Sequence, residues 1–172
     1  LSGNLKATAA STPTTPTNTV LSSGQATLWT STDDVSEIYL NGTLVGTTSN
    51  WNEPASINLT GKLLAGHNVI AIASHDTGGI AGMQAQLLGA GNTVLLGSSA
   101  AGWKYSLSSP SGWQNTGFDD SAWSSPTVGS QTSSPWGNKM PVNDGSAGWI
   151  WSPDSYGHDN VYIRYSFNYV PG

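Results

Sequence analysis

The fold is decided by the stretch STDDVSEIYLNGTLVG at residues 31–46. Its apolar side chains Ile38, Leu40 and Leu44 are predicted to share one face of two short strands. Tyr39 is predicted to lie on the opposite face. The Asn-Gly dipeptide between the strands tolerates the positive φ angles of a two-residue turn. The stretch is therefore predicted to form a β-hairpin with one apolar face.

A second stretch, GKLLAGHNVIAIASHD at residues 61–76, contains a short run that is apolar on both faces, Val69–Ala73. Such a β-branched run is typical of a central strand buried on both sides. We expect the hairpin to cover a sheet that this buried strand crosses. Near the end of the chain, residues 161–169 alternate between apolar and polar and predict a closing strand. Together these segments predict an all-β sandwich.

Length and charge limit the possible partners. The 172 residues suffice for one domain, expected at 20–170 after an N-terminal strand and Thr/Pro-rich spacer at 1–19. Charged residues make up 9% of the chain and the net charge is −5, so no basic surface is expected. Nucleic-acid binding usually depends on basic side chains that displace the counterions of the phosphate backbone. No run approaches the roughly 20 apolar residues of a membrane span. Nucleic acid and membrane insertion are therefore not expected.

The composition also suggests a compartment. A surface rich in hydroxyls and amides but poor in charges is typical of extracellular β proteins. The chain has no cysteine and begins at Leu1, which suits either a mature protein after signal cleavage or a fragment of a larger one. We expect a secreted protein.

The N-terminal segment leaves two interpretations open. Residues 1–10 alternate weakly between apolar and polar, which favours a strand, and Pro13 and Pro16 in the following spacer prevent a helix. The strand could pair with its own domain, or it could be donated to a neighbouring subunit. Donation would make the protein a structural subunit of an extracellular filament or coat that self-associates through residues 1–10.

Several motifs along the chain resemble segments of one class of module. The succession of YLNGTLVG, a lone Trp51 and LTGKLLAGHNVIAI, followed by WKYS, FDDSAW, PWG, WIW and VYIRYSF, resembles the galactose-binding-domain-like jelly rolls of extracellular lectins and glycosidase-associated carbohydrate-binding domains. These motifs span most of residues 28–167. The resemblance implies a jelly-roll β-sandwich of two antiparallel sheets. Related modules bind sugars, peptides or other domains.

Catalysis is not expected from this sequence. A glycosidase needs two carboxylates at a defined separation across a cleft, but Glu37 lies inside a predicted strand and Glu53 precedes a proline in a loop. The neighbouring pairs Asp33-Asp34 and Asp119-Asp120 are predicted to diverge and to serve turns or caps. Motifs of serine hydrolases, zincins and phosphate-binding loops are absent. We expect a protein that is not an enzyme and requires no cofactor.

One metal ion is a candidate. The jelly rolls that this chain resembles often hold a structural calcium ion through Asp, Asn and backbone carbonyl oxygens. The sequence has no EF-hand spacing, but it offers carboxylates for such an ion at Asp33, Asp34, Asp144, Asp154 and Asp159, of which Asp33 and Asp34 are the predicted ligands. Any calcium bound there is expected to be structural.

The aromatic side chains predict carbohydrate recognition. An indole offers a flat apolar surface to the C–H face of a pyranose, while Asp, Asn and His can bond the sugar hydroxyls. Two groups of residues combine these properties. One group is Trp51 and Asn52 together with the loop residues His75 and Asp76, and the other is Trp151, Asp154, Tyr156 and His158. The favoured function is a secreted, non-catalytic, lectin-like carbohydrate-binding module.

Other conspicuous residues are assigned to the scaffold. Trp103, Trp113 and Trp123 are expected to anchor loops or to join the core, because each indole can bury a large area. Arg164 is the single arginine of the chain and lies on the polar face of the closing strand. We expect it to act as a structural fork that binds loop carbonyls or an aspartate.

Overall fold

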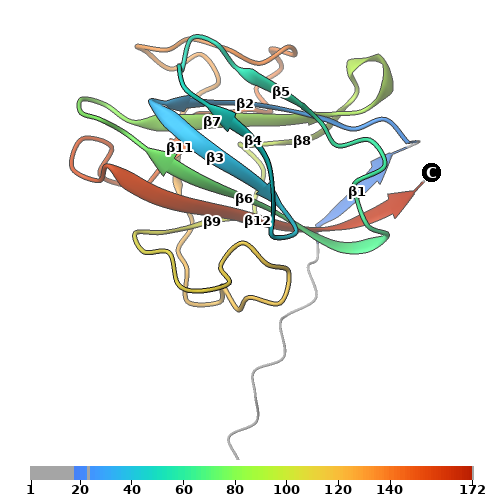
Figure 1. Cartoon of the computed structure of the whole chain (residues 1–172). Helices are drawn as coiled ribbons and strands as arrows, with labels where there is room; N and C mark the ends of the chain where they lie inside the picture. Colours follow the sequence, from blue (N-terminus) through green and yellow to red (C-terminus); the bar gives the residue numbers. More distant parts are fainter. Residues whose placement is uncertain (1–17, 23, 172) are drawn as a thin grey trace, which may run out of the picture.

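The computed structural model describes residues 18–22 and 24–171, which form a β-sandwich of two six-stranded sheets (Figure 1). Sheet A has the order β1 (Thr19–Ser22), β12 (Asn160–Pro171), β6 (Gly66–His75), β3 (Val35–Leu40) and β4 (Thr43–Thr48), and β9 (Trp103–Ser106) also pairs with β12. Sheet B has the order β10 (Thr127–Val128), β11 (Ile150–Trp151), β7 (Gly82–Leu88), β2 (Thr27–Asp33) and β5 (Ala55–Asn58), and β8 (Val94–Gly97) also pairs with β7. The predicted all-β sandwich is confirmed.

The predicted hairpin is formed by β3 and β4. Its turn residues Asn41 and Gly42 have φ angles of 50° and 87°, the left-handed values that the Asn-Gly dipeptide favours. A register shift between Ile38 and Tyr39 places Leu44 opposite Tyr39, and Leu44 is 53% exposed. The prediction that Leu44 shares the buried face is therefore wrong, because a bulge breaks the two-residue alternation.

The strand β6 is the centre of sheet A. Every residue from Val69 to Ala73 is at most 4% exposed, as the apolar run predicts. This strand pairs antiparallel with β3 on one side and with β12 on the other. The hairpin therefore extends the same sheet as the buried strand, and the expectation that it covers a different sheet is wrong.

The core lies between the two sheets. In the closing strand β12, the inward side chains from Val161 to Tyr169 are each at most 8% exposed, in the alternation that the sequence predicts. They pack against inward residues of sheet B such as Leu28, Met83 and Leu87. The short strand β1 pairs with the end of β12 in parallel, so the expected purely antiparallel pairing fails at this edge (Figure 1).

Long connections are pinned to the sheets by buried polar groups. On β7, the amide of Gln84 donates to the carbonyl oxygen of Ala147 over 2.7 Å, and that of Gln86 donates to the carbonyl oxygen of Val142 over 2.9 Å. Buried amides that are satisfied in this way fix one loop conformation. The connection between β10 and β11 is thus held against sheet B together with its Trp136.

Helix is minimal in the described part of the chain. It contains one short 3₁₀ turn, Ala90–Asn92. Among the described residues, no helix has the length and apolar character that crossing a membrane requires.

Candidate functional site at one end of the sandwich

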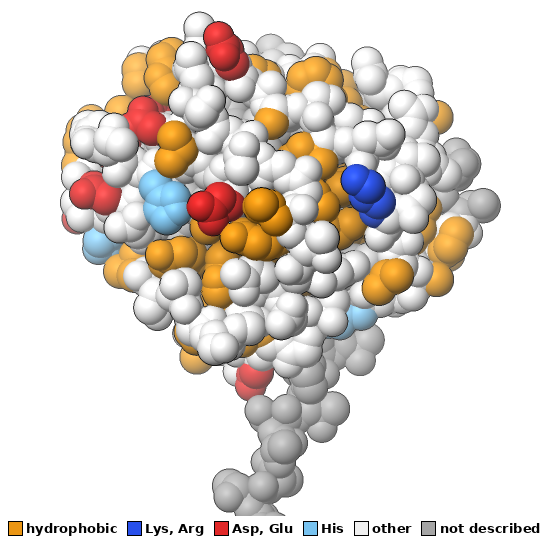
Figure 2. All heavy atoms as spheres, in the orientation of Figure 1, with side chains coloured by type: hydrophobic (Ala, Val, Ile, Leu, Met, Phe, Trp, Pro, Cys, Tyr) orange, Lys and Arg blue, Asp and Glu red, His pale blue; other side chains and the backbone are white. Residues whose placement is uncertain are grey.

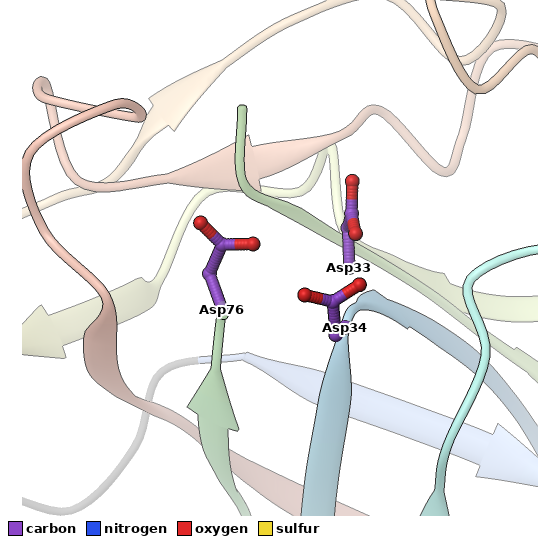
Figure 3. A group of neighbouring side chains, drawn as sticks. All are labelled: Asp33, Asp34 and Asp76. Atoms are coloured by element: carbon purple, nitrogen blue, oxygen red, sulfur yellow. The ribbon is translucent and has the colours of Figure 1, made fainter. Parts of the chain in front are cut away.

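Three aspartates from separate strand ends converge at one end of the sandwich. Asp33 ends β2, Asp34 leads into β3, and Asp76 follows β6. One carboxylate oxygen of each lies within 4.8 Å of the others, and Figure 3 shows the side chains turned toward one another. Neighbours in sequence were predicted to diverge, but Asp33 and Asp34 do not. We call these three residues the carboxylate cluster.

Backbone pairing of sheet A brings the cluster together. The amide N–H of Asp34 donates to the carbonyl oxygen of His75 over 3.0 Å, which aligns the start of β3 with the end of β6. The amide N–H of Asp76 donates to the carbonyl oxygen of Asp159 over 2.7 Å, which joins the β11–β12 connection to the same edge. The positions of the carboxylates are therefore set by the ladder itself.

Two of the three carboxylates have protein partners. The indole N–H of Trp136 donates to Asp33 Oδ2 over 2.8 Å. The amide N–H and the hydroxyl of Thr77 both donate to Asp34 Oδ2, over 2.9 Å and 2.5 Å. Asp76 differs, because it is only 6% exposed and neither of its oxygens accepts a hydrogen bond of normal geometry. A buried carboxylate without a partner is costly unless something else binds it.

The three carboxylates of the cluster have like charges and shifted pKa values. Burial and the neighbouring Asp34 together raise the pKa of Asp33 to about 6, against the lowering effect of the Trp136 hydrogen bond. Burial also raises the pKa of Asp76, partly offset by the backbone N–H of Gly78. The Thr77 hydroxyl lowers the pKa of Asp34. Two carboxyl groups thus resist ionisation while the third is held ionised.

The donor set fits a hard divalent cation. Calcium takes six to eight oxygen ligands, with carboxylates foremost. The cluster offers carboxylate oxygens within reach of one another, and those of Asp76 are unsatisfied. Asp76 was predicted as a sugar partner, but its carboxylate is turned into the cluster beside the two predicted calcium ligands.

The rest of the first predicted sugar group lies on one connection and at the end of one strand. Trp51 and Asn52 belong to the β4–β5 connection, where Trp51 is half-buried and Asn52 is exposed. The ammonium of Lys139 lies 5.1 Å from the centre of the Trp51 ring, and the Trp51 carbonyl accepts a hydrogen bond from Ser31. His75 ends β6, directly before the cluster.

The second predicted group forms a turn stabilised by its own contacts. Asp154 Oδ1 accepts from the amide N–H groups of Tyr156 and Gly157, and the indole of Trp151 donates to the carbonyl oxygen of His158 over 2.9 Å. Tyr156 is 71% exposed, but Trp151 is 3% exposed and belongs to the core. The prediction that Trp151 offers a free stacking face is therefore wrong, because its ring closes the end of the core.

Sequence reasoning missed Trp136. Its ring stacks on Trp149 with centroids 4.6 Å apart, and it lines a pocket of about 210 Å³ that also touches Gly82 and Ser155. The same indole donates to Asp33, so the pocket adjoins the carboxylate cluster. No local sequence pattern links the PWG motif, which contains Trp136, to the distant Asp33.

Polar residue types are distributed unevenly over the face in Figure 2. Acidic and histidine side chains gather toward its left half, where the β6–β7 and β11–β12 connections lie in Figure 1, and a basic side chain lies on the right. The end that carries the carboxylate cluster is thus the more acidic one.

The described residues define a β-sandwich with a carboxylate cluster at one end. Comparison with protein-family models and with curated proteins gives no significant match. A solved structure to which the chain is similar is the crystal structure of Streptomyces avermitilis α-L-rhamnosidase complexed with L-rhamnose, with a TM-score of 0.62 and 30% identity. The alignment covers 73% of this chain but 13% of the rhamnosidase chain, so this sandwich corresponds to a small part of that enzyme.

Proposed function

We propose that the protein is a non-catalytic, calcium-dependent carbohydrate-binding module of an extracellular protein. The observation that carries the proposal is the Asp76 carboxylate, which is buried beside Asp33 and Asp34 and neither of whose own oxygens accepts a hydrogen bond of normal geometry. A calcium ion there would supply the charge that keeps the three carboxylates ionised, together with coordination positions for hydroxyl oxygens. The chain's own part is to hold the carboxylates in place through Trp136 and Thr77.

A carbohydrate is the ligand class that the remaining observations favour. The similar solved structure is an α-L-rhamnosidase in complex with L-rhamnose, and segments of the chain resemble those of galactose-binding-domain-like modules. Only 9% of the residues are charged, so a partner would be recognised through hydroxyls, amides and aromatic rings.

Calorimetric titration tests the proposal. L-rhamnose and a panel of common monosaccharides are titrated into the protein in calcium, then in excess chelator, and again after calcium is restored. We expect saturable binding of at least one sugar at millimolar concentration or below, lost on chelation and recovered with calcium. An absence of binding to every sugar, or binding that chelation leaves unchanged, would contradict the proposal. Release of reducing sugar from a glycoside substrate would refute the non-catalytic part.

A further inference from the structure

The outer face of sheet A carries aromatic side chains in an unusual place. The outer face of a two-layer sandwich is normally polar, because it meets water. Here the loop at residues 107–124 covers part of the face, with Trp113 packed over Val69, Ala71 and Ala73 of β6.

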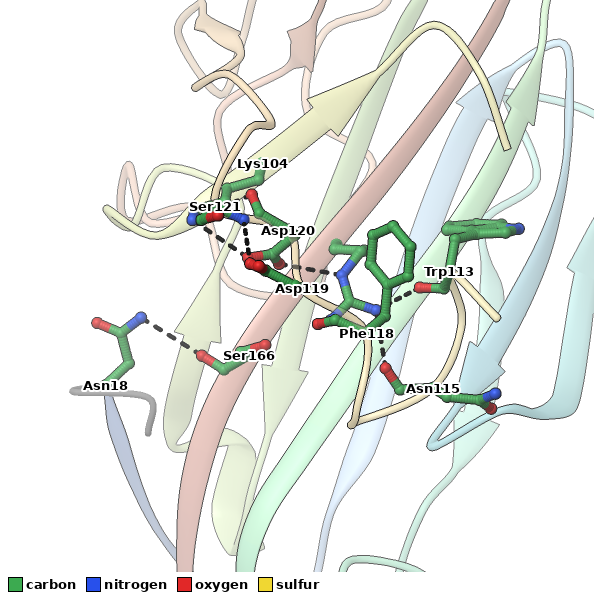
Figure 4. A network of polar contacts seen from close by, with 10 residues as sticks. Asn18, Lys104, Trp113, Asn115, Phe118, Asp119, Asp120, Ser121 and Ser166 are labelled. Atoms are coloured by element: carbon green, nitrogen blue, oxygen red, sulfur yellow. Dashed lines mark hydrogen bonds and ion pairs between the residues drawn. The ribbon is translucent and has the colours of Figure 1, made fainter. Parts of the chain in front are cut away.

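Not all aromatic rings on this face belong to the loop at residues 107–124. Arg164 fixes the loop by donating to the carbonyl oxygens of Trp113 and Asn115 and to Asp120 (Figure 4). Tyr39 and Tyr162 come from the strands β3 and β12 instead, and both are half-buried. Their ring centres lie 6.1 Å and 5.3 Å from that of Trp113, edge to face. Together they form a ring platform on the sheet.

The ring platform has polar groups along its edge. The Tyr39 hydroxyl donates to Glu37 Oε2 over 3.0 Å, and Glu37 is exposed. Asn160 Oδ1 lies 2.6 Å from His75 Nδ1. A carboxamide oxygen can only accept, so His75 Nδ1 is the donor in this contact. Flat apolar rings bordered by such acceptors suit the C–H faces and hydroxyls of a sugar.

The ring platform is continuous with the carboxylate cluster. His75 directly precedes Asp76, and its ring centre lies 6.3 Å from that of Tyr162. Val35, the residue after Asp34, pairs with His75 across the ladder. A chain of sugars with one unit at the cluster could therefore continue over His75 onto the rings.

We infer that the outer face of sheet A binds further units of an oligosaccharide, so that the ligand is a glycan chain instead of a single sugar. This inference rests on the proposed function. A saccharide fits better than a protein partner, because the centres of protein interfaces are depleted of charged groups while Glu37 is exposed within this face. It also fits better than a second copy of the chain, which would bring the Glu37 carboxylates of two copies into one interface.

The test compares two probes, L-rhamnose and a linear tetrasaccharide of L-rhamnose, in calcium. Titrations use the wild type, Tyr39→Ala, Tyr162→Ala, and Leu64→Ala as a control for loss of an exposed apolar side chain elsewhere. We expect the tetrasaccharide to bind about tenfold or more tightly than the monosaccharide, a difference of about 1.4 kcal/mol. Each tyrosine variant is expected to bring the ratio of the tetrasaccharide affinity to the monosaccharide affinity close to one, while Leu64→Ala leaves this affinity ratio unchanged.

The possible outcomes separate this inference from the proposed function. If neither probe nor any other sugar binds in calcium, the proposed function fails. If both probes bind equally, and the tyrosine variants leave their ratio unchanged, the platform inference is overturned while the proposed function stands. Sedimentation of the same variants gives an independent readout. A Tyr39→Ala variant that dissociates an oligomer without changing the affinity ratio would assign the face to self-association and overturn the inference.

Discussion

Replacing Arg164 with methionine should destabilise the fold far more than replacing Lys104, although both cations contact the same carboxylate. The Arg164 side chain is 1% exposed and its Nε lies 3.0 Å from Asp120 Oδ2, while the Lys104 side chain is 35% exposed with its Nζ 3.2 Å from Asp120 Oδ1. Removing one partner of a buried ion pair costs about 3–5 kcal/mol, because the other charge is left unpaired. Exposed pairs contribute roughly 0–1 kcal/mol.

Arg164→Met also removes the donor of the Trp113 carbonyl oxygen and one of the two donors of the Asn115 carbonyl oxygen, so we place its cost at about 4 kcal/mol. The assay is urea unfolding followed by far-ultraviolet circular dichroism, with Lys104→Met as the matched control. We expect the control to lose less than about 1 kcal/mol. Equal losses for the two variants, or a loss below about 1 kcal/mol for Arg164→Met, would refute the assignment of Arg164 as the fork that fixes the loop.

Four further predictions concern the cluster and the N-terminus. Because the pKa of Asp33 is raised to about 6 and that of Asp76 is also raised, protons compete with calcium, and calcium affinity measured by calorimetry should fall as the pH drops through 6. In chelator, at a pH between the ordinary pKa of an aspartate and about 6, Asp33 holds its proton in the folded protein but loses it in the unfolded protein. The contribution of Asp33 to the free energy of unfolding should therefore decrease as the pH rises through this range. Trp136→Phe removes the hydrogen bond that lowers the Asp33 pKa, so the pH midpoint of calcium binding should move upward; an unchanged midpoint would contradict the role of Trp136. Deleting residues 1–10 should leave sugar affinity unchanged, whereas loss of assembly in light scattering would favour the filament alternative.

The elements built from local pattern could be predicted from the sequence. The run Val69–Ala73 identified the central strand because a strand buried on both faces must be apolar throughout. The Asn-Gly dipeptide identified the hairpin turn through its tolerance of positive φ. Arg164 was assigned as a fork to loop carbonyls or an aspartate, and the structure confirms both kinds of contact. The filament alternative depends on residues 1–10, which lie outside the described part of the chain.

The arrangement of these elements could not be predicted in the same way. The bulge that exposes Leu44 depends on pairing between strands, which alternation within one strand does not encode. Asp76 resembled a loop residue facing solvent, but the ladder bond from its amide to Asp159 holds it at the buried strand end. Trp151 was predicted to offer an exposed ring, but it belongs to the core cluster and its indole donates to the carbonyl oxygen of His158. A site assembled from distant strand ends leaves little trace in local sequence.

The central claim, that the carboxylate cluster holds calcium, is tested most directly by titrating calcium into the metal-free protein while following thermal unfolding. At about 100 times the dissociation constant, binding should add about 2.7 kcal/mol to the free energy of unfolding. Asp76→Asn should abolish this gain without destabilising the metal-free protein, since it removes a buried carboxylate that lacks a partner. Asp144→Asn, at an exposed carboxylate outside the cluster, should keep the full gain. An unfolding midpoint that calcium leaves unchanged, or an equal gain in wild type and Asp76→Asn, would contradict the claim.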